Sequence, residues 1–252
     1  MERLILISRF RSQVLTLKDY LSFSKNVLIE LGKLDAVFAN SFSWAGNKKH
    51  RISGFDNYYT NFEETVFSQK IWDEEIRYSN PDTGNFNCTM DSTSSIGFLN
   101  SYSNVNDSSL NQFVVRISAG GNKGNDIGYI NIEFPTSFDT KYYDYFFVKK
   151  LMLKIIELVD PIYAVVTTDN FIDLVELENT DFWIGWFTYL KKQNIEFNIN
   201  NLIEEEFITD TDQGIVLTLG KETISSNNEI IVSKAIAVRN ELLKLNLLNY
   251  NR

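Results

Sequence analysis

The chain has 252 residues, of which 44% are hydrophobic and 14% aromatic, and its formal net charge at pH 7 is −9. This hydrophobic content excludes a disordered chain, and the length allows one large domain or two small ones around a sizeable core. One cysteine, Cys88, excludes a disulfide framework within the chain and fits a reducing compartment.

The N-terminal segment is continuously apolar only over Leu4–Ile7, which is too short for the hydrophobic region of a signal peptide. No stretch approaches the roughly 18–20 apolar residues that a membrane-spanning helix needs. We therefore expect a soluble, cytoplasmic protein without a membrane partner.

The first part of the chain predicts a strand followed by a helix. Residues 2–10 centre on the apolar run and are typical of a strand. Residues 15–33 carry apolar side chains at helical spacing, with Thr16 as the expected N-cap and Gly32 as the expected C-cap. The segments expected next are extended residues 34–39, extended residues 41–44 and the basic loop 46–51.

The middle of the chain predicts one amphipathic helix and three strands. Residues 62–78 show apolar positions at helical spacing with acidic residues between them. The expected strands are residues 94–103, 112–118 and 127–134. The glycine-rich linker 119–126 lacks the Gly-Lys-Ser/Thr end of a phosphate-binding loop and precedes a strand, so we interpret it as a long hairpin loop.

The C-terminal part alternates helices with buried strands. Residues 140–159 give the clearest helical pattern, and Pro161 follows its end. The later expected elements are a strand at 162–168, a short helix or ordered loop at 169–181, strands at 182–190 and 214–220, and a helix at 228–246.

This order of elements predicts an α+β fold with mixed or antiparallel sheets and helices packed on them. We expect one continuous domain over residues 1–252, because no linker rich in Pro, Gly or Ser divides the chain. A doubled plan, with pseudo-duplicated halves at about 1–110 and 111–252, is compatible with the same pattern.

Residues 182–190 are the densest apolar stretch and hold two of the four tryptophans. As a strand they would be apolar on both faces, which is typical of a central strand with layers above and below it. We therefore expect this stretch to be structural, with both tryptophans mainly buried. The expected core positions are Trp183, Gly185, Trp186 and Tyr189.

Acidic residues gather around that stretch. Residues 160–212 hold 12 acidic residues against Lys191 and Lys192. Such a surface repels nucleic acid and attracts basic proteins, although an acidic face that only aids solubility gives the same pattern. The candidate partner-binding carboxylates are Asp169, Asp173, Glu176, Glu178, Asp181, Glu204, Glu205 and Glu206.

The sequence contains few residues in patterns typical of catalytic sites. Its single histidine, His50, lies in the basic loop, and Cys88 has no evident base nearby. Asp210–Gly214 is similar to the start of a calcium loop but lacks the glycine and the glutamate that such a loop needs. We expect no catalytic residue, no metal and no cofactor, which favours a binding protein over an enzyme.

A sequence motif points to a family. Gly185-Trp186-Phe187-Thr188-Tyr189-Leu190 resembles the Gly-Trp-Met-Thr-Tyr-Leu motif of the bacterial immunity protein 52 family, with Phe187 in place of the commoner Met. Further segments that resemble the family, in the same order along the chain, are Ser41–Trp44, Tyr163–Thr167, Gly214–Leu219 and Ala235–Arg239.

The resemblance implies an antitoxin for a secreted effector of a type VI secretion system. In that family the cognate toxin is often a nuclease with a restriction-endonuclease-like fold, and the immunity protein has no catalytic residues. An acidic surface would complement the basic cleft of a nuclease. Exposed aromatic side chains would add hot-spot anchors, for which the candidates are Trp44, Trp72 and Phe171.

Two other classes stay open at this point. One is a hydrolase with a metal-dependent carboxylate site, which a bound divalent metal ion would support. The other is a structural or scaffold protein, which an exposed apolar patch pairing two copies would favour.

Overall fold

The computed structural model describes residues 2–39, 42–45, 48–51, 91, 93, 97–104, 112–121, 127–136, 140–177, 182–191 and 203–248. The chain forms two compact units, Phe10–Ile132 and Met1–Arg9 with Glu133–Arg252. The chain crosses from one unit to the other inside strands β1 (Ile5–Arg11) and β6 (Ile127–Glu133), so no linker separates them. The predicted helix at 62–78 lies outside the described residues.

The sheet of the unit Phe10–Ile132 has the strand order β3-β2-β4-β5-β6. Its strands are β2 (Phe42–Ala45), β3 (Lys48–Arg51), β4 (Phe98–Ser103), β5 (Val114–Ala119) and β6. The pairs β2–β3, β2–β4 and β4–β5 are antiparallel. The basic segment predicted as a loop therefore forms a strand, since Lys48–Arg51 pairs along its length with β2.

Helix α1 (Leu17–Leu34) begins as predicted, because the Thr16 side chain accepts a hydrogen bond of 3.1 Å from the Asp19 amide. The predicted end at Gly32 is wrong, since the helix continues to Leu34 and Asp35 is its C-cap. The predicted extended segment that follows is also wrong. Helix α2 (Ala36–Ala39) starts there because the Asp35 carboxylate accepts a hydrogen bond of 2.9 Å from the Val37 amide.

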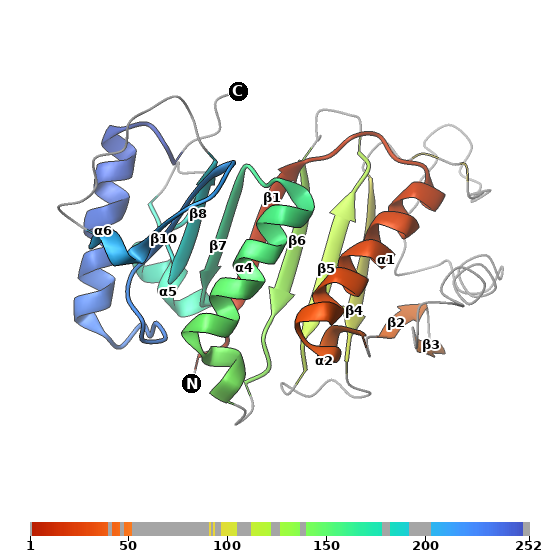
Figure 1. The fold of residues 1–252 in the computed structure, drawn as a ribbon, viewed down its shortest axis with the longest axis horizontal. Coiled ribbons are helices and arrows are strands. Elements are labelled where there is room, and N and C mark those ends of the chain that lie inside the picture. Colours follow the sequence, from red (N-terminus) through yellow and green to blue (C-terminus); the bar gives the residue numbers. More distant parts are fainter. Residues whose placement is uncertain are drawn as a thin grey trace. The chain divides into compact units, whose positions relative to one another are not determined.

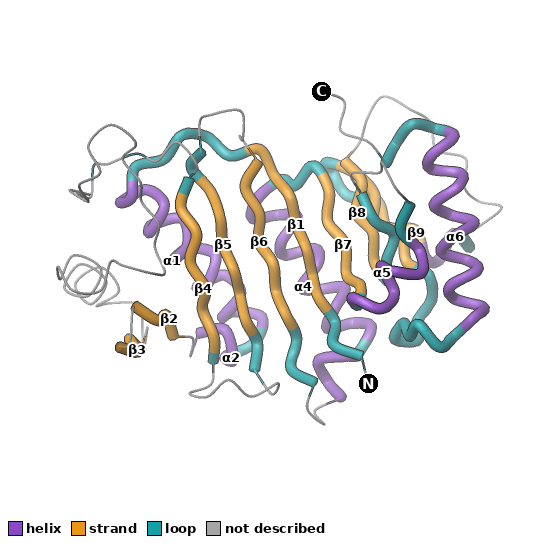
Figure 2. The backbone as a smooth tube through the Cα atoms, turned by 180° about the vertical axis from the view of Figure 1, so that it is seen from behind, coloured by secondary structure: helices purple, strands orange, loops and turns teal. Residues whose placement is uncertain are grey.

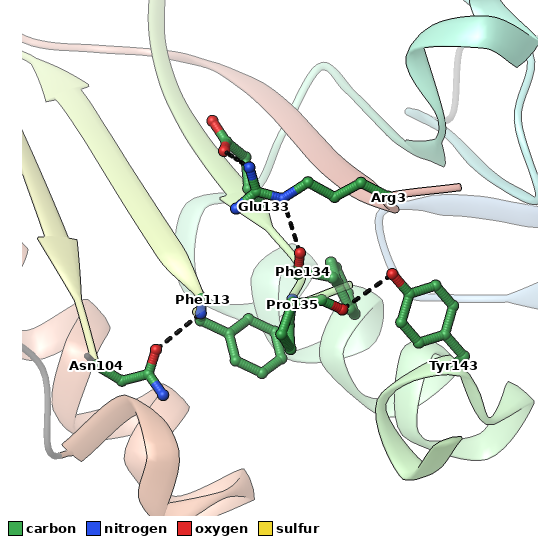
Figure 3. A network of polar contacts seen from close by, with 7 residues as sticks. All are labelled: Arg3, Asn104, Phe113, Glu133, Phe134, Pro135 and Tyr143. Atoms are coloured by element: carbon green, nitrogen blue, oxygen red, sulfur yellow. Dashed lines mark hydrogen bonds and ion pairs between the residues drawn. The ribbon is translucent and has the colours of Figure 1, made fainter. Parts of the chain in front are cut away.

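Helices α1 and α2 pack on one face of this sheet (Figure 1). The Tyr20 hydroxyl donates a hydrogen bond of 2.8 Å to the Ile117 carbonyl, and its ring lies 5.3 Å from that of Phe98. Burial alternates along β5 and β6, as expected for a sheet covered on one face. The Asn104 side chain accepts a hydrogen bond from the Phe113 amide just before β5 (Figure 3).

The sheet of the other unit has the order β1-β7-β8-β10-β9, and all of its neighbouring pairs are antiparallel. Its further strands are β7 (Tyr163–Thr167), β8 (Phe187–Lys191), β9 (Ile208–Asp210) and β10 (Gly214–Thr218). Every residue of β7 and β10 is buried, which requires layers on both faces of this sheet.

Helix α4 (Tyr145–Val159) supplies the layer on one face. It follows a 3₁₀ turn, Thr140–Tyr143, and the Asp144 carboxylate caps it by accepting from the Phe146 and Phe147 amides. Helix α5 (Asp169–Val175) lies on the opposite face, and α6 (Glu229–Lys244) packs beside it (Figures 1 and 2).

The register agrees with this assignment of the two faces. Arg9 pairs with Tyr163, so their side chains share one face, and Val166 pairs with Phe187 on the other. The ring of Tyr145 in α4 lies 5.3 Å from that of Phe187, which places the even-numbered positions of β7 under α4. The odd-numbered positions of β7 therefore face the side of α5.

The predicted α+β class with antiparallel sheets and packed helices is confirmed. The two units do not coincide with the halves 1–110 and 111–252, and the doubled plan stays a prediction. Among the described residues, no helix combines the length and apolar character needed to cross a membrane.

Candidate partner-binding surface

The stretch 182–190 forms a strand only in its second half. Strand β8 begins at Phe187 and lies between β7 and β10, with Thr188 opposite Val165 on one side and Leu217 on the other. Its central position confirms the prediction for Phe187–Leu190. The residues before Phe187 lead into the strand without belonging to the sheet.

Gly185 has no room for a side chain. A Cβ atom there would lie 2.6 Å from Val165 Cγ2 and closer still to the Val166 carbonyl oxygen. Its amide donates a hydrogen bond of 3.1 Å to Thr188 Oγ1, which holds the turn into β8 against β7. This close approach supports the structural role predicted for Gly185.

Trp186 and Tyr189 are core residues, as predicted, and neither is exposed to solvent. The Trp186 indole donates a hydrogen bond of 2.9 Å from Nε1 to the Gly220 carbonyl, so its polar atom is satisfied inside the core. Burial raises the pKa of the Tyr189 hydroxyl above its ordinary range.

Trp183 is less buried than the other three positions, because part of its side chain remains accessible to solvent. It precedes β8, and the Tyr163 hydroxyl fixes its backbone by accepting from its amide at 2.8 Å and donating to its carbonyl. The indole Nε1 donates a hydrogen bond of 3.0 Å to Glu176 Oε1, and the Arg9 guanidinium lies 5.5 Å from the ring centroid. Trp183 thus lies at the surface beside α5.

Helix α5 is amphipathic over its whole length. Phe171 is completely buried and Val175 nearly so, which places this pair, four positions apart, on the inner face. The predicted anchor role of Phe171 is therefore wrong, because its ring cannot contact a partner. The exposed side chains of the segment include the candidate acids and two leucines: Asp169, Asp173, Leu174, Glu176 and Leu177.

The start of α5 is fixed by the carboxylate of Glu2. Thr168 caps the helix by accepting from the Phe171 amide, and it donates a hydrogen bond of 2.5 Å to Glu2 Oε2. The other oxygen of Glu2 accepts from the Ser226 amide and hydroxyl and from the Ser225 hydroxyl, just before α6. Partial burial works against the charged form, but these hydrogen bonds outweigh it and lower the pKa of Glu2.

The end of α5 is fixed by α6. Arg239 donates a hydrogen bond of 2.5 Å from Nη1 to the Val175 carbonyl, which is one of the unpaired carbonyls at the end of α5. Burial lowers the pKa of this guanidinium below its ordinary value. Helix α5 is therefore held at both ends.

The second group of candidate acids lies elsewhere in the same unit. Glu204, Glu205 and Glu206 are exposed around the 3₁₀ turn Glu205–Phe207. Basic residues accompany this group, since Lys221 forms an ion pair of 3.2 Å with Glu206. The ammonium of Lys234 lies 5.2 Å from the Phe207 ring.

A polar network ties the N-terminus to the segment after β6 (Figure 3). Arg3 donates a hydrogen bond of 2.8 Å from Nε to the Phe134 carbonyl and forms an ion pair of 2.6 Å with Glu133. Tyr143 donates to the Pro135 carbonyl at 3.0 Å. Burial lowers the pKa of Arg3, against the opposing charge effects of Tyr143 and Asp169.

The structure describes the remaining candidate residues only in part or not at all. Glu178, Asp181 and Trp72 lie outside the described residues, and of Trp44 the structure places the backbone, in β2. Among the residues that the structure describes, no three His, Cys, Asp or Glu side chains are placed to hold a metal ion. The sequence reasoning missed the exposed Leu174 and Leu177 and the surface position of Trp183. The apolar residues of 169–181 were visible as a pattern, but which of them face solvent was not.

Comparison with known proteins gives a likeness of fold. No family model matches the sequence, and no curated protein matches it. Among solved structures, the fold is similar to that of the Pseudomonas aeruginosa T6SS protein PA0821, with a TM-score of 0.55 and 10% sequence identity. The match covers 98% of this chain and 76% of that one.

Proposed function

We propose that this chain is an immunity protein that binds a cognate secreted toxin and neutralises it. The supporting observation is the likeness of fold to a protein described as a type VI secretion system protein, over nearly the whole chain. The immunity role itself rests on the sequence resemblance of residues 185–190 to the immunity protein 52 family, since no family model matches the chain.

The charge distribution supports a basic partner. Two groups of the predicted carboxylates are exposed, one on α5 and one around the 3₁₀ turn before β9. A toxin that cuts nucleic acid presents a basic cleft to phosphates, and an acidic protein would be complementary to that cleft. The attraction would raise the association rate most strongly at low salt.

The test is protection in a living cell. The effector encoded by the reading frame next to that of this chain would be expressed in a susceptible bacterium, alone and together with this protein. Co-expression is expected to restore growth, and the two proteins are expected to copurify. Continued killing by an active effector, with this protein folded and present in excess, would refute the proposal.

A second experiment tests whether the protein neutralises the toxin by inhibiting its nuclease activity. Purified effector domain would be assayed on plasmid DNA and on RNA with increasing amounts of this protein. Loss of cleavage at a one-to-one ratio is expected for stoichiometric inhibition. A mutant of this protein that no longer binds should leave cleavage unchanged, which excludes competition for the nucleic acid itself.

A further inference from the structure

We infer that the toxin docks on the α5 surface, defined here as Asp169, Asp173, Leu174, Glu176, Leu177 and Trp183. This inference rests on the proposed function and assigns it a place and a partner chemistry. The partner that fits these residues is a protein with a basic surface that contributes at least one apolar side chain.

The centre of the α5 surface is apolar. Leu174 is 49% exposed on α5, whose other face fills the core with Phe171 and Val175, and Leu177, two residues after the helix, is 38% exposed. Trp183 is partly buried, and its indole donates a hydrogen bond to Glu176, the residue before Leu177. Exposed aromatic and aliphatic side chains held close together are the usual anchors of a protein interface.

The edge of the α5 surface is acidic. Residues 168–177 contain Asp169, Asp173 and Glu176 and no lysine or arginine. Three arginines adjoin this surface: Arg9 lies over the Trp183 ring, Arg239 donates to the Val175 carbonyl, and the charge of Arg3 interacts with Asp169. The group Glu204–Glu206 is less suited to a basic partner, because Lys221 already forms a direct ion pair with one of its carboxylates, Glu206. An apolar centre with an acidic edge is complementary to a basic partner.

Hydrogen bonds hold the ends of α5 and the backbone at Trp183. Thr168 and Glu2 hold the start of the helix, and Arg239 holds its end. The Tyr163 hydroxyl fixes the Trp183 backbone on both sides of the residue. Docking on such a surface loses little conformational entropy, which favours affinity.

The test measures binding of the effector domain from the neighbouring reading frame to purified variants. The double variant Leu174→Ser/Leu177→Ser is expected to raise Kd at least about tenfold, since hot-spot truncations have effects of this size. The conservative variant Trp183→Phe should weaken binding less than Trp183→Ala. The matched control is Phe146→Ser on α4, which is 66% exposed on the opposite face of the sheet and should leave Kd unchanged.

The outcomes separate the two levels of the proposal. If the wild type binds and protects while Leu174→Ser/Leu177→Ser binds equally well, the α5 surface is wrong and the immunity function stands. If the wild type neither binds nor protects, both the α5 surface and the immunity function are refuted. Circular dichroism and thermal melting of each variant must match the wild type, and Asp173→Lys serves as a second variant if the leucine changes disturb folding.

Discussion

The carboxylate of Glu2 accepts a hydrogen bond of 2.5 Å from the Thr168 hydroxyl, 166 positions further along the chain. Its other oxygen accepts from the Ser226 amide at 2.8 Å. One side chain near the N-terminus therefore joins the segments that lead into α5 and α6. An anion at the start of a helix also interacts favourably with the helix dipole.

Replacing Glu2 by Gln should destabilise the protein by about 1 kcal/mol, after allowance for the solvent exposure of this side chain. The neutral amide keeps the shape of the side chain but loses the charge that strengthens these hydrogen bonds. Urea denaturation would measure the change. Glu222→Gln, at an exposed position outside the helices, is the control and should have little effect. Equal effects of both substitutions would contradict the role of Glu2.

The same contacts predict a pH dependence. The pKa of Glu2 is lowered in the folded protein from its ordinary 4.5, so the folded state binds this proton less readily than the unfolded state. The stabilisation is therefore complete above pH 4.5 and is lost as the pH falls through the lower, folded value. The difference in melting temperature between wild type and Glu2→Gln should shrink on acidification below pH 4.5. A difference that stays constant down to pH 2 would refute this linkage.

Gly185→Ala should destabilise the central sheet by about 1–3 kcal/mol or more, because the added methyl group would collide with the backbone of β7. The obstacle includes the Val166 carbonyl oxygen, which cannot move without disturbing the pairing of β7 with β8. Gly220→Ala is the matched control, since no atom lies within 4 Å of its added Cβ. Equilibrium unfolding would compare the two variants. Equal stabilities would show that the backbone shifts to accommodate the methyl group at position 185, against this prediction.

The two tryptophans of residues 182–190 should differ in their energetic roles. Trp186→Ala should cost about 3–5 kcal/mol, because the indole is completely buried and its Nε1 donates to the Gly220 carbonyl. Trp183→Ala should cost clearly less, because part of its side chain is accessible to solvent. Thermal melting checks the order, and acrylamide should quench the fluorescence of Trp183 more than that of Trp186. A larger loss for Trp183 would contradict its surface position.

These tryptophans also show what the sequence can predict. The pattern at 182–190 identified a central strand, since alternation and burial follow from the residues themselves. It did not predict that pairing starts only at Phe187, because the Tyr163 hydroxyl, 20 positions away, holds Trp183 out of the sheet. The surface position of Trp183 therefore depends on a tertiary contact, which the hydrophobic periodicity of the sequence cannot predict.

A similar division holds for the helices and for the candidate surface. The sequence predicted α1 and its N-cap from Thr16, which is local information, but missed α2, whose start depends on the single carboxylate of Asp35. The acidic excess predicted exposed carboxylates on α5. It did not predict that Phe171 faces the core while Leu174 faces solvent, since the orientation of a two-turn helix is set by the sheet beneath it.

Charge reversal on α5 should slow association with the toxin. The triple variant Asp169→Lys/Asp173→Lys/Glu176→Lys changes the charge by two at each position, from −9 to −3 overall. The association rate at low salt should fall by about tenfold or more, and its dependence on salt should flatten, because electrostatic steering acts on the rate of encounter. Stopped-flow mixing with the effector domain over a range of ionic strength would measure both.

The matched comparison is Glu204→Lys/Glu205→Lys/Glu206→Lys, which makes the same change of net charge at the other acidic group. If the α5 surface faces the toxin, this variant should retain most of the association rate, because its charges lie outside the contact and act mainly through screened, longer-range attraction. Equal slowing by both triple variants would show that overall charge steers the encounter. That result would contradict a local role for the α5 carboxylates, even if the protein still protects cells from the toxin.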